Sequence, residues 1–109
     1  MLLAKQKPHY NLPKVQKLID ADQYVMVKTS RTTAFQMGFN MARIKDALLS
    51  IRRSDFSKSE PDWQVKGQWQ DAYKPYYEGF HLYIKWKVVE TNDESVLVLS
   101  FKEGTDKGL

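Results

Sequence analysis

The alternation of apolar and polar residues between Phe80 and Lys102 constrains the fold of this chain more than any other feature. Successive side chains of a strand point to opposite faces. One face of the first segment carries Phe80, Leu82, Ile84, Trp86 and Val88, and the other carries His81, Tyr83, Lys85 and Lys87. A second segment divides in the same way, with an apolar side formed by Leu97, Leu99 and Phe101. The pattern predicts two strands of a sheet that has one buried and one polar face.

Matching the apolar faces of these segments predicts how the two strands pair. An antiparallel hairpin that turns at Asn92-Asp93 places Trp86 opposite Leu99. Tyr83 then lies opposite Lys102 on the polar side.

A second hairpin, turning at Tyr76-Tyr77, is predicted to bring a third strand alongside. It would place Gln70 opposite Tyr83. An amide, a phenol and the ammonium group of Lys102 would then form one row across three strands. We expect such a row to be a surface suited to gripping a phosphodiester.

The N-terminal half has the spacing of helices. After a flexible arm over 1–11, apolar residues at helical intervals predict a first helix from about Pro13 to Ala21. The β-prone run Gln23–Thr29 predicts a strand. Ser30 and Asn40 are candidate N-caps of two further helices, and the second of these buries Ile44, Ala47, Leu48 and Ile51. The fold class is therefore α+β, with about three N-terminal helices and one early strand packed on a mainly antiparallel, twisted sheet.

A chain of 109 residues is expected to form one domain. We place it at 12–103, followed by a mobile tail at 104–109. Ser54–Lys66 contains serines, a proline and mixed charges, so we expect a loop between the helical half and the sheet.

Composition narrows the function classes. The net charge of +4 and the isoelectric point near 9.3 favour a polyanionic partner. The chain has no cysteine and only two histidines, far apart in sequence, so we expect no disulfide, no metal and no cofactor. No segment approaches the roughly 20 apolar residues of a membrane span. We expect no signal peptide, because the apolar start Met1–Ala4 is short and a polar stretch follows it at once. We therefore expect a cytoplasmic protein.

Several segments match one known family in order along the chain. The four motifs are Ser54–Ser59, Trp69–Pro75, Tyr83–Lys85 and Val98–Glu103, and the opening Lys7-Pro8-His9 and the segment Lys14–Ile19 fit as well. Together they resemble the MqsR family, the motility quorum-sensing regulator toxins of bacterial type II toxin–antitoxin systems. The similarity extends over nearly the whole chain, from about Lys7 to Glu103.

The resemblance implies a RelE-like fold and a sequence-selective mRNA endoribonuclease that cuts free mRNA, preferentially at GCU, and so inhibits translation and growth. It implies an MqsA-like antitoxin with zinc-binding and helix-turn-helix regions, and a toxin that is a monomer alone and a hetero-oligomer with its antitoxin. The catalytic residues that it implies are Lys58, Gln70, Tyr83 and Lys102. Two neighbouring positions depart from the family: Ser57, where tyrosine is frequent, and Lys74, where arginine is usual.

Metal-free RNA cleavage uses the neighbouring 2′-hydroxyl as nucleophile and needs a base, an acid and cationic stabilisation of the phosphate. Our hypothesis is that Lys58 and Lys102 stabilise the phosphate, Tyr83 donates or relays a proton, and Gln70 orients the scissile group. Which group acts as the general base stays open.

Further residues are candidates for RNA contact. Tyr76 and Tyr77 are expected at a hairpin tip, where they could stack on bases. Trp63, Tyr73, Trp69 and Trp86 are further stacking candidates, but Trp69 and Trp86 fall on the apolar face and are expected in the core. Flanking phosphates are expected to meet Lys74, Lys85, Lys87, Arg52 and Arg53, and His81 is a further RNA contact or a structural residue.

Simpler explanations stand beside these. A lone strand lysine is most often solvated, and Tyr83 and Gln70 can be ordinary cross-strand partners. The alternative functions are a non-catalytic RNA- or ribosome-binding module and a protein-interaction domain whose basic face meets an acidic partner.

Overall fold

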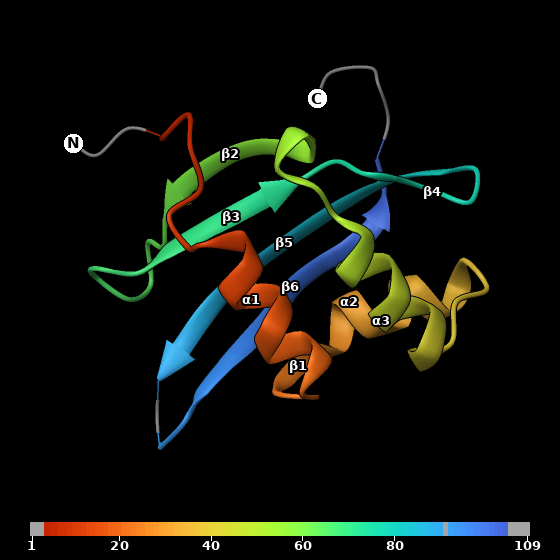
Figure 1. The fold of residues 1–109 in the computed structure, drawn as a ribbon, viewed down its shortest axis with the longest axis horizontal. Coiled ribbons are helices and arrows are strands. Elements are labelled where there is room, and N and C mark those ends of the chain that lie inside the picture. Colours follow the sequence, from red (N-terminus) through yellow and green to blue (C-terminus); the bar gives the residue numbers. More distant parts are fainter. Residues whose placement is uncertain (1–3, 91, 105–109) are drawn as a thin grey trace.

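Helices cover one face of a single sheet in the computed structural model, which describes residues 4–90 and 92–104 (Figure 1). The α-helices are α1 (Leu12–Asp20), α2 (Lys28–Gln36) and α3 (Met41–Ser50), and a short 3-10 helix, η1, spans Arg53–Asp55. The strands are β1 (Tyr24–Met26), β2 (Phe56–Pro61), β3 (Trp69–Tyr73), β4 (Tyr76–Tyr77), β5 (Phe80–Glu90) and β6 (Glu94–Glu103). The sheet order is β1-β6-β5-β3-β2, with β4 paired to β5. Only β1 and β6 are parallel among these pairs, which confirms the predicted α+β class with a mainly antiparallel sheet.

Asparagine side chains start two of the helices. The Asn11 Oδ1 accepts a hydrogen bond from the Lys14 backbone N–H, and the Asn40 Oδ1 accepts one from the Arg43 N–H. Each bond satisfies a backbone donor that the first helical turn leaves unpaired. Asn40 is therefore confirmed as a cap, whereas Ser30 is not one. Ser30 lies inside α2, buried, and its hydroxyl donates to backbone carbonyls of Val27 and of β6.

The core lies between the sheet and the layer formed by α1 and α3. Apolar side chains of these helices meet the buried side of β5 and β6, including Ile84, Trp86 and Phe101. The N-terminal segment continues this layer across β2 and β3 (Figure 1). There the buried carboxylate of Asp71 accepts hydrogen bonds from the backbone N–H groups of His9 and Tyr10. These contacts give part of the expected N-terminal arm fixed neighbours, and its flexibility stays a prediction.

Part of the expected loop at Ser54–Lys66 is a strand. Phe56–Pro61 forms β2 at the edge of the sheet, where it pairs with β3. The serines and the proline that suggested a loop are compatible with an edge strand, because one side of such a strand needs no backbone donor for a neighbour. The true loop is shorter and runs from Asp62 to Gln68.

The hairpin before β5 turns two residues later than predicted. Tyr76 and Tyr77 are β4 and pair with His81 and Phe80, so the turn is Glu78-Gly79. Both turn residues have positive φ values, +47° and +87°, as a two-residue type I′ turn requires. The register of β3 against β5 shifts accordingly, and Gln70 does not lie opposite Tyr83.

The β5–β6 pairing was predicted correctly at one end only. Tyr83 pairs with Lys102, as expected, but Trp86 pairs with Val98 because a β-bulge at Leu99 interrupts the register. An extra residue in one strand reverses which face the following side chains occupy. Val98 is therefore buried in the core, while the expected core residue Leu99 is only half-buried.

The mobile tail predicted at 104–109 lies, apart from Gly104, outside the described residues. Within the described residues, no helix is long and apolar enough to cross a membrane.

Candidate functional site: a lysine-rich sheet face

The sheet face opposite α1 and α3 is polar, and we call it the polar face. Its side chains include Lys58, Glu60, Gln70, Ala72, Lys74, Tyr83, Lys85, Lys87, Ser100 and Lys102, and Leu97, which was expected on the apolar side, lies on this face opposite Lys87. They fall into rows across the strands, because paired residues of neighbouring strands point to the same side. Four lysines of this face, Lys58, Lys74, Lys85 and Lys102, are exposed or half-buried.

Tyr83 and Lys102 are direct neighbours in the first row. They pair across β5 and β6, and the Lys102 ammonium lies 5.4 Å from the centre of the Tyr83 ring. On the other side of β5, the bond from the Leu82 N–H to the Pro75 carbonyl continues the β3–β5 register past Tyr73, which sets Lys74 opposite Tyr83. The row is therefore Lys74–Tyr83–Lys102, with a lysine in the place predicted for Gln70.

Lys58 belongs to the next row, together with Lys85. The chain of paired residues runs from Lys58 through Ala72 and Lys85 to Ser100. A β-bulge at Ser57 makes this possible, because plain alternation would turn Lys58 to the same side as Phe56, which packs against Tyr73. Because of the bulge, Lys58 instead points to the polar face, in the row next to that of the half-buried Tyr83.

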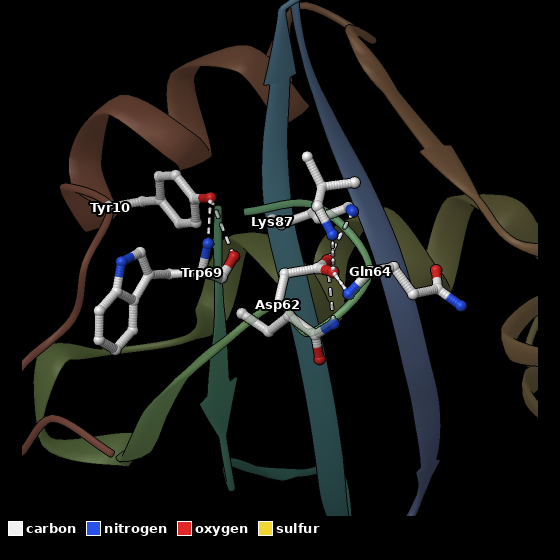
Figure 2. A network of polar contacts seen from close by, with 7 residues as sticks. Tyr10, Asp62, Gln64, Trp69 and Lys87 are labelled. Atoms are coloured by element: carbon white, nitrogen blue, oxygen red, sulfur yellow. Dashed lines mark hydrogen bonds and ion pairs between the residues drawn. The ribbon is translucent and has the colours of Figure 1, made fainter. Parts of the chain in front are cut away.

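Gln70 lies at the far end of the polar face and contacts a buried ion pair. Its amide Nε2 donates to the Asp62 carboxylate at 3.2 Å. The Lys87 ammonium donates to the same oxygen at 2.7 Å (Figure 2). The exposed fractions of the two charged side chains are only 2% for Asp62 and 10% for Lys87. The remaining Asp62 oxygen accepts the backbone N–H groups of Gln64 and Val65.

These contacts change the acidity of Asp62. Burial by itself favours the neutral acid, but the hydrogen bonds from Lys87, from Gln70 and from two backbone N–H groups outweigh it. Together they hold the pKa of Asp62 well below its usual range. Asp62 is therefore a permanent anion at neutral pH that neutralises Lys87, so Lys87 is not a free cation for RNA. This pair was not predicted, because Asp62 lies in the segment that was expected to be a loop.

Tyr83 has the opposite kind of shift. Burial, with the nearby carboxylate of Glu60 as a second cause, raises the pKa of Tyr83 above its ordinary value. Both causes disfavour the phenolate, so the hydroxyl keeps its proton at neutral pH. Such a group can donate a proton and cannot readily take one. Glu60 itself forms an ion pair with Lys58 at 3.5 Å.

The other predicted RNA contacts separate into two groups. Tyr76 is exposed, and its ring stacks on His81 with 4.2 Å between ring centres. Tyr77 is buried and donates its hydroxyl to Asp46 on α3, so it presents no ring face to a base. Tyr77 was expected at an exposed hairpin tip. The turn instead lies at Glu78-Gly79, so Tyr77 is not at the tip.

Arg52 and Arg53 lie away from the polar face. They line a different hollow with Lys7 and the start of α1, and the Arg53 guanidinium sits 5.4 Å from the Phe56 ring centre on the helix-covered side. A phosphate bound near Tyr83 would not meet them. Among residues 4–90 and 92–104, no three histidine, aspartate or glutamate side chains come together as metal ligands would.

Comparison with known proteins identifies the family of this chain. The model of the family described as motility quorum-sensing regulator, toxin of MqsA, matches residues 7–103. The chain belongs to this family. A curated relative, the mRNA interferase toxin MqsR of Escherichia coli (strain K12), is 30% identical over 101 residues, which cover 93% of this chain and 99% of the relative.

Family membership makes the protein a toxin, and the four family motifs fall on the strands of the polar face. Ser54–Ser59 leads into β2, Trp69–Pro75 forms β3, Tyr83–Lys85 lies in β5, and Val98–Glu103 lies in β6. Three of the residues that the family resemblance implicates, Lys58, Tyr83 and Lys102, occupy adjacent rows, whereas Gln70 is one row further along than Lys58.

Proposed function

We propose that this MqsR-family toxin is an mRNA endoribonuclease that cleaves RNA without a metal, through attack of the 2′-hydroxyl on the adjacent phosphate. The products would be a 2′,3′-cyclic phosphate and a 5′-hydroxyl end. The observation that carries the proposal is the pairing of Tyr83, a phenol that stays protonated, with Lys102 beside it on a face lined with further lysines.

Tyr83 fits the general acid in this reaction. The leaving 5′-oxygen needs a proton as its bond to phosphorus breaks, and a raised pKa keeps that proton on Tyr83 until then. Lys102 and Lys58 lie on either side of Tyr83, in its own row and in the next. Their ammonium groups would stabilise the charge that develops on the phosphate oxygens.

Gln70 takes a different role from the one expected from sequence. Its row lies four residues along β5 from that of Tyr83, which is roughly 13 Å at about 3.4 Å per residue. Its amide nitrogen is held by Asp62, which fixes the side chain and leaves the amide oxygen as a hydrogen-bond acceptor. We infer that Gln70 orients a nucleotide next to the scissile phosphate.

The resemblance to the family adds three more specific features to the proposal. They are a preference for GCU, cleavage of free mRNA, and neutralisation by a cognate MqsA-like antitoxin. Co-purification of the toxin with the product of the neighbouring open reading frame tests for a cognate antitoxin. Loss of cleavage upon addition of that product would support neutralisation.

Cleavage of a defined transcript in EDTA tests the reaction. We expect cuts at discrete triplets, with cyclic phosphate on the upstream fragment and 5′-hydroxyl on the downstream one. Salt-sensitive RNA binding without cleavage would instead favour the non-catalytic RNA-binding module. Absence of RNA binding would favour a protein-interaction domain.

A further inference from the structure

Trp63 is the most exposed large apolar side chain among the described residues, at 86% exposure. The other tryptophans have partners: Trp86 is fully buried, and Trp69 stacks on His9 and lies under the Lys5 ammonium. An exposed indole ring does not stabilise the fold, because its apolar surface is not removed from solvent. Trp63 therefore needs an explanation outside the folded chain.

The loop that carries Trp63 is held in one conformation by buried groups. Its ends are joined by the bond from the Asp62 N–H to the Gln68 carbonyl, and the Asp62 carboxylate accepts two N–H groups from inside the loop. The same carboxylate binds Lys87 on β5 (Figure 2). Gly67 closes the loop with a φ of +90°, a conformation that favours glycine. The indole thus projects from a fixed platform, and little entropy would be lost when it binds a ligand.

A hollow beside Trp63 has the chemistry of a nucleotide site. It measures about 540 Å³ and is lined by Glu60, Pro61, Trp63, Gln70 and Lys85. Its volume lies in the range of small-ligand sites. Trp63 and Pro61 form an apolar wall, and the other lining side chains are charged or carry an amide. Lys85 supplies a cation for a phosphate, and Gln70 supplies amide hydrogen bonding for a base or a sugar hydroxyl.

The position of this hollow completes a path along the polar face. Tyr76 and His81 stack at one end, and Trp63 stands near the other, where Gln70 pairs with Glu60. From His81 to Lys87, β5 spans about 20 Å at roughly 3.4 Å per residue. Lysines of the two rows between these ends would meet the phosphates of a single strand that crosses the face.

We propose that Trp63 stacks on an RNA base and that this loop and hollow form a nucleotide-binding subsite next to the cleavage site. The inference rests on the proposed function, because it places a base of the same RNA strand. A single ring that stands among charged and amide groups suits a base, which offers a flat face and polar edges. A protein partner would be expected to use a larger continuous apolar patch.

Binding of a 2′-O-methyl oligoribonucleotide tests the subsite without cleavage, because the nucleophile is blocked. We expect Trp63→Ala to raise the Kd about tenfold, as loss of one stacked base predicts, and Trp63→Phe to keep most of the affinity. Phe35→Ala is the matched control, since Phe35 is an exposed aromatic residue on α2. It should leave the Kd unchanged. In cleavage assays of ordinary RNA, Trp63→Ala should raise KM and leave kcat near that of the wild type.

An abasic oligonucleotide series identifies the base. Removal of the base that contacts Trp63 should weaken binding to the wild type about tenfold and weaken binding to Trp63→Ala no further. Wild-type binding and cleavage with an unchanged Kd for Trp63→Ala would overturn the subsite and leave the proposed function intact. A Trp63→Ala variant that loses only antitoxin binding would also overturn it. A wild type that neither binds nor cleaves RNA would overturn both.

Discussion

Lys102 and Lys87 lie on the same face of the same sheet and have opposite environments. Lys102 is exposed at one end, beside a protonated phenol. Lys87 is buried at the other end, 2.7 Å from a carboxylate that is a permanent anion. The lysines of this polar strand face therefore do not form one uniform cationic surface. One end is arranged for chemistry on a phosphate, and the other holds a loop in place.

The two ends also differ in what a substitution should change. A group at the Tyr83–Lys102 end has few structural contacts, so its loss should affect the reaction and spare the fold. A group at the Asp62–Lys87 end supports several hydrogen bonds, so its loss should affect stability first. Four predictions test this difference between the two ends.

Tyr83→Phe removes the proposed general acid and should have the largest effect. We expect the cleavage rate to fall about 10²- to 10⁴-fold, the range for loss of a positioned acid. The melting temperature should stay near that of the wild type. Single-turnover cleavage of a defined transcript measures the rate. The control is Tyr76→Phe, which removes an exposed hydroxyl from the row next to that of Tyr83 and keeps the ring that stacks on His81.

Asp62→Ala leaves Lys87 buried without its anion. We expect a loss of about 3–5 kcal/mol in the free energy of unfolding, as when one partner of a buried pair is removed. Urea denaturation followed by circular dichroism measures it. The double variant Asp62→Ala/Lys87→Met should recover part of the loss, because no buried charge remains. If Asp62→Ala were as stable as the wild type, the Asp62–Lys87 pair would not support the fold.

Acid should weaken the same end of the sheet. The folded pKa of Asp62 lies below its unfolded value near 3.9, so its contribution to stability is present above that pH and is lost as the pH falls toward the folded pKa. The urea midpoint of the wild type should therefore drop between about pH 5 and pH 3 more steeply than that of Asp62→Asn. Parallel pH profiles would contradict the assignment.

Glu60→Gln should have the smallest effect on stability and a visible effect on the reaction. The half-exposed Lys58–Glu60 pair contributes about 0–1 kcal/mol. The Glu60 carboxylate helps to raise the pKa of Tyr83, so its neutralisation lowers that pKa, although burial still keeps it raised. An acid loses activity above its pKa, and the alkaline limb of the pH–rate profile should move to lower pH. If the alkaline limb stayed at the same pH, Tyr83 would not be the general acid.

Strong alternation made part of the site predictable. The Tyr83–Lys102 pair followed from the apolar face of β5 and from a hairpin whose register is continuous at that end. Asn40 was also recognisable, because a cap depends on a local hydrogen bond.

The rest depended on features that local patterns do not reveal. Gln70 was misplaced because two turn residues with positive φ, Glu78 and Gly79, moved the hairpin. The bulges at Ser57 and Leu99 reversed side-chain faces, and no residue pattern in these strands marks an inserted residue. The Asp62–Lys87 pair joins residues 25 positions apart, so it exists only once the strands are paired.

We propose that the Tyr83–Lys102 end performs the chemistry and that the Asp62–Lys87 end does not. The direct measurement is the single-turnover cleavage rate of Tyr83→Phe beside that of Lys87→Met, in EDTA, at a temperature where both variants are folded. We predict a loss of at least about a hundredfold for Tyr83→Phe and a far smaller loss for Lys87→Met. A Tyr83→Phe variant that cleaves as fast as the wild type would contradict the account.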